Sequence, residues 1–253
     1  NYNMGSELLD KGLTFYEVKT LIHIGAHEAQ EVWVYDQYDF QKIYLVEPLP
    51  RCISIIKDKI STKPKYKLFD CALGSRDEKT DIYIADGEDS GSSSLLKPRD
   101  SKITFSNKIQ INVKKFTSLG IDKVDAAVID TQGFEIEVLK GFEDKIASLK
   151  FAIVEFANYE GYKMQPKYKD LNRFMKSKGF VVIDQIKRIN QPIPTINAGS
   201  YGDALYVNKN LLNVRQIFFG NFNYYYRNNI IYDLLVFYKK KSKIFLKNIL
   251  KLS

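Results

Sequence analysis

Acidic side chains stand at the ends of several apolar runs whose length suits β-strands. Asp130 ends the run DAAVID, and Glu155 lies near the end of LKFAIVEF. In an open parallel sheet, ligands bind outside the carboxyl ends of the strands, so we expect both acids to face one cavity. Their mutual repulsion would raise the pKa of one carboxyl toward neutrality and suit a general base. The sequence therefore predicts catalytic roles for Asp130 and Glu155.

A glycine turn, GAHEAQE, begins at the end of the first apolar run of the chain, TLIHIG, and Glu47 ends the second run, KIYLVE. Glycine permits close approach of the main chain to a ligand. A carboxylate at the end of the second strand can accept hydrogen bonds from both hydroxyls of a ribose. The turn lacks the three glycines of the dinucleotide fingerprint, so a nucleoside without phosphates fits better. S-adenosylmethionine is such a ligand. Its predicted contacts are Gly25, Ala26, His27, Glu47, Pro48, Cys71, Ala72 and Asp130.

Within this set, different residues are assigned to different parts of the cofactor. We expect the free amides from Gly25 to His27 to hold the amino-acid end, and Cys71 and Ala72 to lie near the adenine. The His27 imidazole is also a candidate base, with positioning or packing as the alternative, whereas His23 reads as a core histidine.

Polar side chains near the acids are candidates for binding an acceptor that is rich in hydroxyl groups. Gln132 follows Asp130, and Ser93 and Ser94 lie in the Gly-, Ser- and charge-rich stretch 86–108. A long loop of this kind is typically functional, so we expect it to close over the cleft; a solvated loop is the alternative. Tyr159 offers an aromatic face to a sugar ring, although a structural tyrosine is equally ordinary there.

The same acids could instead hold a divalent cation, which would lower the pKa of an acceptor hydroxyl. Asp130 and Glu155 alone are few ligands for a dedicated site, although Gln132 or Asn158 could complete the shell. Metal dependence therefore stays open at this point.

Apolar runs and helical patterns alternate along the chain and must position these residues. Strands are expected at 20–25, 42–47, 66–74, 80–85, 109–113, 126–130 and 149–156, and helices at 28–39, 49–61, 134–141 and 167–178. The segments 180–186 and 203–208 resemble a closing antiparallel pair. The pattern predicts an α/β, Rossmann-like fold, with a seven-stranded, mostly parallel sheet and helices on both faces.

Charge and composition separate a body from a tail. The formal net charge is +8, and residues 211–253 hold eight Lys/Arg and a single Asp among many aromatics. We interpret 211–253 as a basic, aromatic-rich helical appendage that could dock on a membrane surface, on a partner subunit or on the body itself. A nearly neutral body disfavours nucleic acid as the partner of the main cleft.

Nothing in the sequence resembles a spanning helix or a secretory signal, and Cys52 and Cys71 match no metal or redox spacing. We therefore expect a cytoplasmic protein that could lie peripherally on a membrane. The chain begins at Asn1, with Met4-Gly5-Ser6 following, which fits either vector-derived residues or excision from a longer polypeptide.

Several motifs, in this order, resemble the FkbM family of S-adenosylmethionine-dependent methyltransferases: IGAHEAQE, YLVEPLP, CALGS, SSSL, VIDTQGFEIEVLKG, IVEF and GDALYVN. The resemblance implies a class I methyltransferase fold and methyl transfer to a hydroxyl, often on a sugar. Two residues depart from the family pattern, since His27 replaces a common Asn and Ala29 a common Gly. KKFTSLG replaces the family's usual Thr-Leu-Asp, and 211–253 has no counterpart.

These observations predict a methyltransferase domain at about 10–210 that methylates a hydroxyl of a sugar or glycoconjugate. The alternative from another class is a non-catalytic module with this fold, recruited to a membrane or partner complex through its tail. A nucleotide-sugar oxidoreductase is a further alternative, disfavoured by the glycine-poor turn.

Overall fold

The structure, a computed structural model, describes residues 4–99, 103–105, 107–189 and 199–212. Nearly all of the predicted tail 211–253 therefore lies outside the described residues, and its docking role stays a prediction. Within the described ranges, no helix is long and apolar enough to cross a lipid bilayer.

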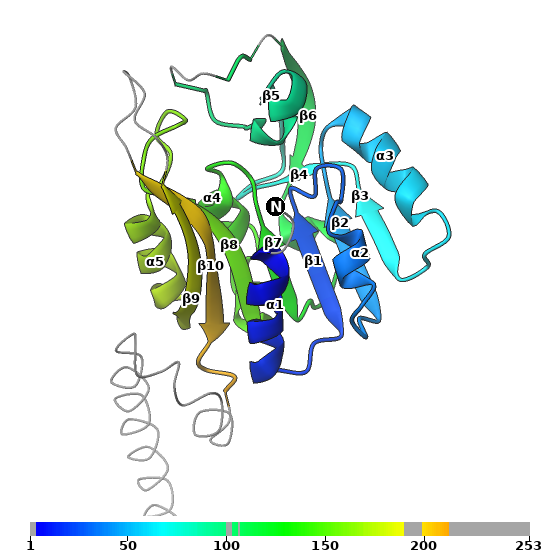
Figure 1. Ribbon diagram of the computed structural model, residues 1–253, viewed down its shortest axis with the longest axis vertical. Helices are drawn as coiled ribbons and strands as arrows, with labels where there is room; N and C mark the ends of the chain where they lie inside the picture. The colour runs from blue at the N-terminus through cyan, green and yellow to red at the C-terminus, as the bar shows by residue number, and fades with distance from the viewer. Residues whose placement is uncertain (1–3, 100–102, 106, 190–198, 213–253) are drawn as a thin grey trace, which may run out of the picture.

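A seven-stranded sheet forms the centre of the protein, in the order β3-β2-β1-β7-β8-β10-β9 (Figure 1). Its strands are β1 (Thr20–Ile24), β2 (Lys42–Val46), β3 (Tyr66–Phe69), β7 (Ala126–Ile129), β8 (Phe151–Ala157), β9 (Phe180–Ile189) and β10 (Ser200–Asn208). β10 runs antiparallel to both of its neighbours, whereas the other pairs are parallel. The predicted α/β class, mostly parallel sheet and closing antiparallel pair are confirmed.

Helices cover both faces of this sheet, which explains why its strands read as continuous apolar runs. On one face, α1 (Met4–Phe15) packs on β8, β9 and β10 and buries Leu8 and Leu9 completely (Figure 1). On the other face, α5 (Tyr168–Ser177) buries Met175. The sequence analysis did not predict α1, and the expected domain start at residue 10 falls within it.

The remaining helices are short and connect strands. They are α2 (Val32–Tyr35), α3 (Pro50–Ile60), α4 (Glu135–Lys140) and the 3-10 helices η1 (Gly87–Ser92), η2 (Phe116–Leu119) and η3 (Glu143–Ser148). The helix predicted at 28–39 is wrong in length, because Ala29 has φ +50° and cannot belong to a right-handed helix.

A second, three-stranded sheet lies beyond the carboxyl edge of the main sheet. It has the order β4-β6-β5 and consists of β4 (Ala72–Leu73), β5 (Glu78–Ile84) and β6 (Asn107–Lys114). The single strand predicted at 66–74 is two strands, β3 and β4. The last hydrogen bond that β3 makes in the main sheet runs from Glu47 N–H to Phe69 O, and β4 belongs to the second sheet. The run at 80–85 is antiparallel to β6 and does not continue the parallel order.

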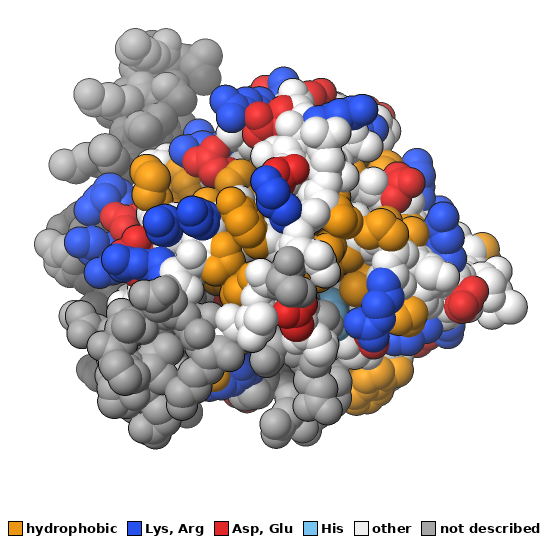
Figure 2. Space-filling view, turned by 90° about the horizontal axis from the view of Figure 1, so that it is seen from above, with side chains coloured by type: hydrophobic (Ala, Val, Ile, Leu, Met, Phe, Trp, Pro, Cys, Tyr) orange, Lys and Arg blue, Asp and Glu red, His pale blue; other side chains and the backbone are white. Residues whose placement is uncertain are grey.

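Seen from above, the carboxyl edge presents hydrophobic side chains in the middle of the face, with most charged side chains around them (Figure 2). A third apolar cluster, formed by Leu49, Cys52, Ala72, Ile82, Ile111 and Val113, joins the second sheet to the start of α3. The small sheet thus forms an apolar cover beside the edge where the predicted site residues lie.

Candidate functional site

The turn after β1 brings the main chain against two neighbouring strand ends. Gly25 has φ +80°, and a Cβ built on it would lie 1.7 Å from the carbonyl oxygen of Asp130, so only glycine fits. The N–H groups of Gly25 and Ala26 donate to Val46 O at 3.0 and 3.1 Å, and that of His27 donates to the carboxylate after β2. The prediction of free amides is therefore wrong, because the end of β2 already accepts all three.

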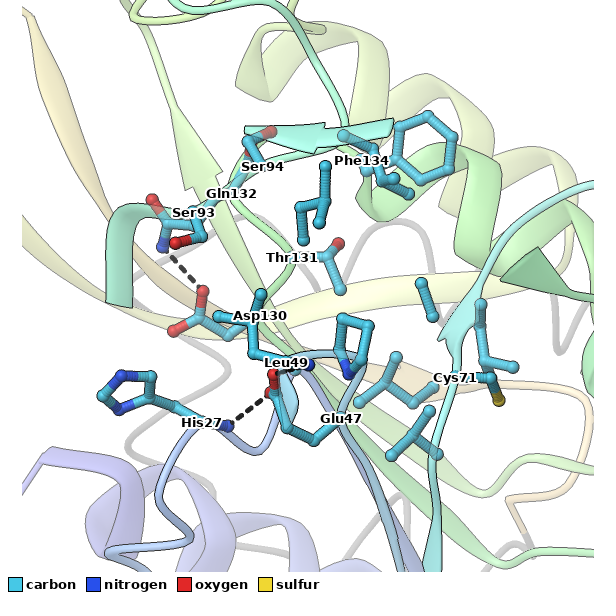
Figure 3. Close-up of a pocket in the computed structure, with 18 of the residues that line it drawn as sticks. His27, Glu47, Leu49, Cys71, Ser93, Ser94, Asp130, Thr131, Gln132 and Phe134 are labelled. Carbon is cyan, nitrogen blue, oxygen red and sulfur yellow. Dashed lines mark hydrogen bonds between the residues drawn. The ribbon is translucent and has the colours of Figure 1, made fainter. Parts of the chain in front are cut away.

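Glu47, at the end of β2, is the carboxylate that holds this turn. Its Oε2 accepts from His27 N at 2.8 Å, and its Oε1 accepts from Leu49 N at 2.9 Å (Figure 3). The side chain is buried, and burial raises its pKa to about 7. A carboxylate offers about four lone-pair sites, so both oxygens can still accept hydrogen bonds from a ligand.

A pocket opens between this turn, the turn after β7 and the second sheet. Its lining includes most of the predicted residues, namely Gly25, His27, Glu47, Pro48, Cys71, Ala72, Ser93, Ser94, Asp130 and Gln132. The pocket also has an apolar wall that was not predicted from the sequence, made by Leu49, Leu73, Ile82, Leu95 and Phe134. The alternating pattern of TDIYIA was the available signal for Ile82, because it places Ile82 and Ile84 on one face.

The turn after β7 is held by a second buried glutamate, Glu135. Its Oε1 accepts from Thr131 N at 3.1 Å and from Gly133 N at 2.9 Å. Burial raises the pKa of Glu135 to about 7. The side chain thus fixes the loop that carries Asp130 and Gln132 and belongs to the local turn rather than to the pocket lining.

Asp130 and Glu155 are joined by the amide of Gln132. Gln132 has φ +53°, and its Nε2 donates to Asp130 Oδ1 at 2.8 Å and to Glu155 Oε2 at 2.9 Å (Figure 3 draws the first bond). Burial, followed by the charges of Asp130 and Glu135, raises the pKa of Glu155 well above its usual range, and a hydrogen bond with Asp130 adds to the shift. The structure therefore brings the two predicted acids together.

The two predicted serines anchor the loop that carries them. Ser94 Oγ donates to the main-chain oxygen of Gln132 at 2.8 Å and accepts from Leu96 N at 3.0 Å, with 1% of the residue exposed. Ser93 Oγ accepts from Ala85 N at 3.0 Å. These bonds hold the stretch 91–96 against the turn after β7, and the predicted substrate contacts of the serines stay predictions.

Tyr159 lies apart from this pocket. Its half-buried ring makes an edge contact with Tyr201, with the ring centroids 6.2 Å apart. The nearby Tyr162 hydroxyl instead donates to Ser92 O at 2.6 Å. This bond connects the segment after β8 to the loop that carries Ser93 and Ser94. A sugar contact by Tyr159 stays a prediction.

The His27 side chain lines the pocket beside Asp130 (Figure 3). Its Nδ1 lies 3.2 Å from Gln30 Nε2, which orients the ring. His23 is buried and lies 3.1 Å from the Tyr35 hydroxyl, as expected of a core histidine. Among the described residues, no group of three or more His, Cys, Asp or Glu side chains is arranged to hold a metal ion.

Comparison with known proteins places this site within a family. The profile of the Methyltransferase FkbM domain matches residues 23–182. The 2-O-methyltransferase NoeI of Sinorhizobium fredii (strain NBRC 101917 / NGR234) is 21% identical over 138 residues, which make up 49% of this chain and 57% of that protein. The chain thus matches little more than half the length of this curated relative.

Two solved structures illustrate the likeness at the level of coordinates. Methyltransferase FkbM from Methylobacillus flagellatus KT has a TM-score of 0.49 at 14% identity, covering 75% of this chain and 43% of that one. Magnesium protoporphyrin IX methyltransferase from Synechocystis PCC 6803, solved with bound SAM, has a TM-score of 0.46 at 11% identity, covering 80% and 75%.

The matched residues 23–182 make up more than half of the chain and contain Gly25, Glu47, Asp130 and Glu155, around which the site is built. The sequence match and the strand order of the sheet therefore lead to one conclusion: the chain belongs to the FkbM methyltransferase family.

Proposed function

We propose that this protein is an O-methyltransferase that uses S-adenosylmethionine as the methyl donor and a hydroxyl of a sugar, in a glycan or glycoconjugate, as the acceptor. The observation that carries the proposal is Glu47. It is a buried carboxylate at the end of β2, and it faces a pocket at the position where a ribose is bound in doubly wound folds.

The chemistry of the pocket fits this cofactor. Glu47 would accept the ribose hydroxyls, and the apolar wall with Ile82 and Leu95 would cover the adenine. The lining residues include the carboxylates of Glu47 and Asp130 but no Lys or Arg among the described residues, which suits a cation better than a pyrophosphate. When bound, the cofactor supplies a methyl group on a positively charged sulfur.

The paired acids suit an acceptor that must lose a proton. Methyl transfer to a hydroxyl requires a group that accepts the hydroxyl proton as the new bond forms. Asp130 lies in the pocket wall, and Gln132 holds Glu155 beside it. Asp130 and Glu155 are thus the proposed proton acceptors, with Gln132 fixing their separation.

Different observations support oxygen as the methylated atom and a sugar as the acceptor. The name of the relative NoeI, a 2-O-methyltransferase, favours oxygen as the methylated atom. The sugar follows from the family resemblance and from the polar loop with Ser93 and Ser94 beside the pocket.

Isothermal titration calorimetry with S-adenosylmethionine tests the cofactor. We expect the wild-type protein to bind it and Glu47→Ala to bind it at least about tenfold more weakly, because one carboxylate with two hydrogen bonds is lost. Glu137→Ala, a surface change on α4, is the matched control and should bind normally. A folded wild-type protein that binds no S-adenosylmethionine would overturn the proposal in favour of the non-catalytic alternative.

Mass spectrometry of glycans from cells with and without the protein tests the acceptor. We expect sugars in cells with the protein to carry an additional methyl group on oxygen. Methylation confined to another class of molecule would retire the sugar while leaving the methyltransferase activity in place.

A further inference from the structure

A second pocket, with about 240 Å³ of free space, lies on the other face of the main sheet, beneath α1. His23, Val128 and Ile153 form its floor, and Ser6 and Leu9 of α1 form part of its outer wall. The cofactor pocket, in contrast, touches Ile24 and Val46, whose side chains belong to the apolar cluster of the opposite face. This free space is larger than that of the cofactor pocket.

Asp130 is the one described residue that lines both pockets. A methyl group is transferred in line, so the acceptor oxygen must approach from the side opposite the sulfur, and the two ligands must meet at one point. Two pockets that are both lined by Asp130 would bring the two ligands to one residue. Glu155 lines the second pocket only, which places the second acid of the pair on the acceptor side.

The second pocket has an excess of hydrogen-bond acceptors and of negative charge. Glu31, Asp203 and Asp130 line it, and Arg188 is the only Lys or Arg among its described lining residues. Glu31 Oε2 is buried and accepts no hydrogen bond from any residue that the structure describes, and it lies 3.9 Å from His23 Nδ1. A buried acceptor without a donor costs free energy, so a ligand that brings O–H or N–H groups would be stabilised here.

We propose that this second pocket binds the methyl acceptor, and that it selects an uncharged or amino-bearing polyol over a carboxylated or phosphorylated one. The inference rests on the proposed methyl transfer and adds to it the place and the charge class of the acceptor. An anionic acceptor would bring further negative charge against Glu31, Asp203 and Asp130, whereas hydroxyl or ammonium groups would donate to them.

The two walls of the pocket come from different parts of the chain. His23, Asp130 and Glu155 lie within the matched family domain, residues 23–182. Leu9, Arg188 and Asp203 lie outside it, on α1, β9 and β10. The geometry therefore assigns the reacting groups to the shared domain and divides the selection of the acceptor between Glu31 of that domain and the segments that flank it.

Saturation-transfer difference NMR with three hexoses of similar size and different charge tests this assignment. The probes are methyl glucoside, glucosamine and glucuronate, measured at pH 7, where the amino group of glucosamine is mostly protonated. Burial and the charge of Asp130 raise the pKa of Asp203 to about 6, so Asp203 is ionised at that pH. We expect binding of methyl glucoside and glucosamine, and at least tenfold weaker binding of glucuronate.

Isosteric variants locate the probes in the second pocket. Asp203→Asn and Glu31→Gln remove one negative charge each and should each weaken glucosamine about tenfold relative to glucuronate. Glu137→Gln, on α4 at the other face, should change neither. Equal binding of the three hexoses, binding of none, or charge preferences unchanged in both variants would overturn the proposal.

Calorimetry with S-adenosylmethionine on the same samples distinguishes failure of the acceptor pocket from failure of the proposed methyl transfer. Normal cofactor binding together with failed hexose selection would reject the acceptor pocket and leave the proposed methyl transfer standing. Absence of cofactor binding by the folded wild-type protein would reject both the acceptor pocket and the proposed methyl transfer.

Discussion

Two buried glutamates, Glu47 and Glu135, each hold a polar turn at the carboxyl edge of the sheet, and burial raises the pKa of each to about 7. Glu47 reaches the turn after β1 from the neighbouring strand, twenty residues away from His27 in the sequence. Glu135 belongs to the helix that directly follows its own turn and accepts from Thr131 and Gly133.

The difference between them lies in which space their oxygens face. Glu47 lines the cofactor pocket, whereas Glu135 is absent from the lining of both described pockets. Equal burial and an equally raised pKa therefore do not identify a ligand-binding acid. The position of the carboxylate relative to a cavity separates the binding glutamate from the structural one.

The largest effect should follow from breaking the contact that closes the first turn. Gly25→Ala adds a Cβ that would lie 1.7 Å from Asp130 O, at a residue with φ +80°. We expect the free energy of unfolding, measured by chemical denaturation, to fall by more than about 3 kcal/mol, because strain and overpacking add.

Gly120→Ala is the matched control, since Gly120 has φ +68° and a Cβ added there would meet no atom within 4 Å. Its loss should be about 1–2 kcal/mol, which is the cost of the left-handed backbone alone. Equal losses in the two variants would show that the close approach of β1 and β7 is not what requires glycine.

Glu135→Ala and Glu47→Ala test the division of roles directly. Each removes an acceptor from two main-chain N–H groups, so each should lower the free energy of unfolding by about 1–3 kcal/mol. Calorimetry should then distinguish them, with S-adenosylmethionine affinity falling at least tenfold only in Glu47→Ala. Similar affinities in the two variants would remove the distinction between a binding and a structural glutamate.

The smallest effect is a pH dependence that only one glutamate should cause. The raised pKa of Glu47, about 7, means that the free protein holds a proton there at lower pH, whereas ribose hydroxyls favour the ionised carboxylate. We expect the Kd for S-adenosylmethionine to rise as pH falls below 7, approaching tenfold per pH unit, equivalent to about 1.4 kcal/mol.

The glutamine variants assign that dependence to a residue. Glu47→Gln should flatten the pH profile of the Kd between pH 5 and 7, and Glu135→Gln should leave it unchanged. If the profile flattens only in Glu135→Gln, the proton linked to cofactor binding belongs to Glu135. The roles assigned to the two glutamates would then be reversed.

Much of the site could be predicted because it lies at strand ends that are visible in the sequence. Glu47 and Asp130 follow apolar runs, and the carboxyl ends of parallel strands share one edge. Local rules failed where a residue adopts an unusual backbone, as at Ala29, whose φ of +50° shortens the expected helix. They also failed at 66–74, where the chain leaves one sheet for another.

The left-handed backbone also gives a physical meaning to the two departures from the family pattern. His27 and Ala29 have φ values of +46° and +50°. Asn and Gly, the residues common in the family at these places, are those that adopt this region most readily. His27 and Ala29 therefore adopt a backbone that Asn and Gly would adopt more readily.

The sequence by itself determined the alternation of strands and helices, the family, and the acids that end the strands, because these follow from local patterns of apolar and polar residues. Only the tertiary structure decided which acids lie together, which glutamate faces a cavity, and that α1 covers a second pocket beside Asp130. Those properties depend on distances between strands that are remote in the chain, and no local pattern encodes such distances.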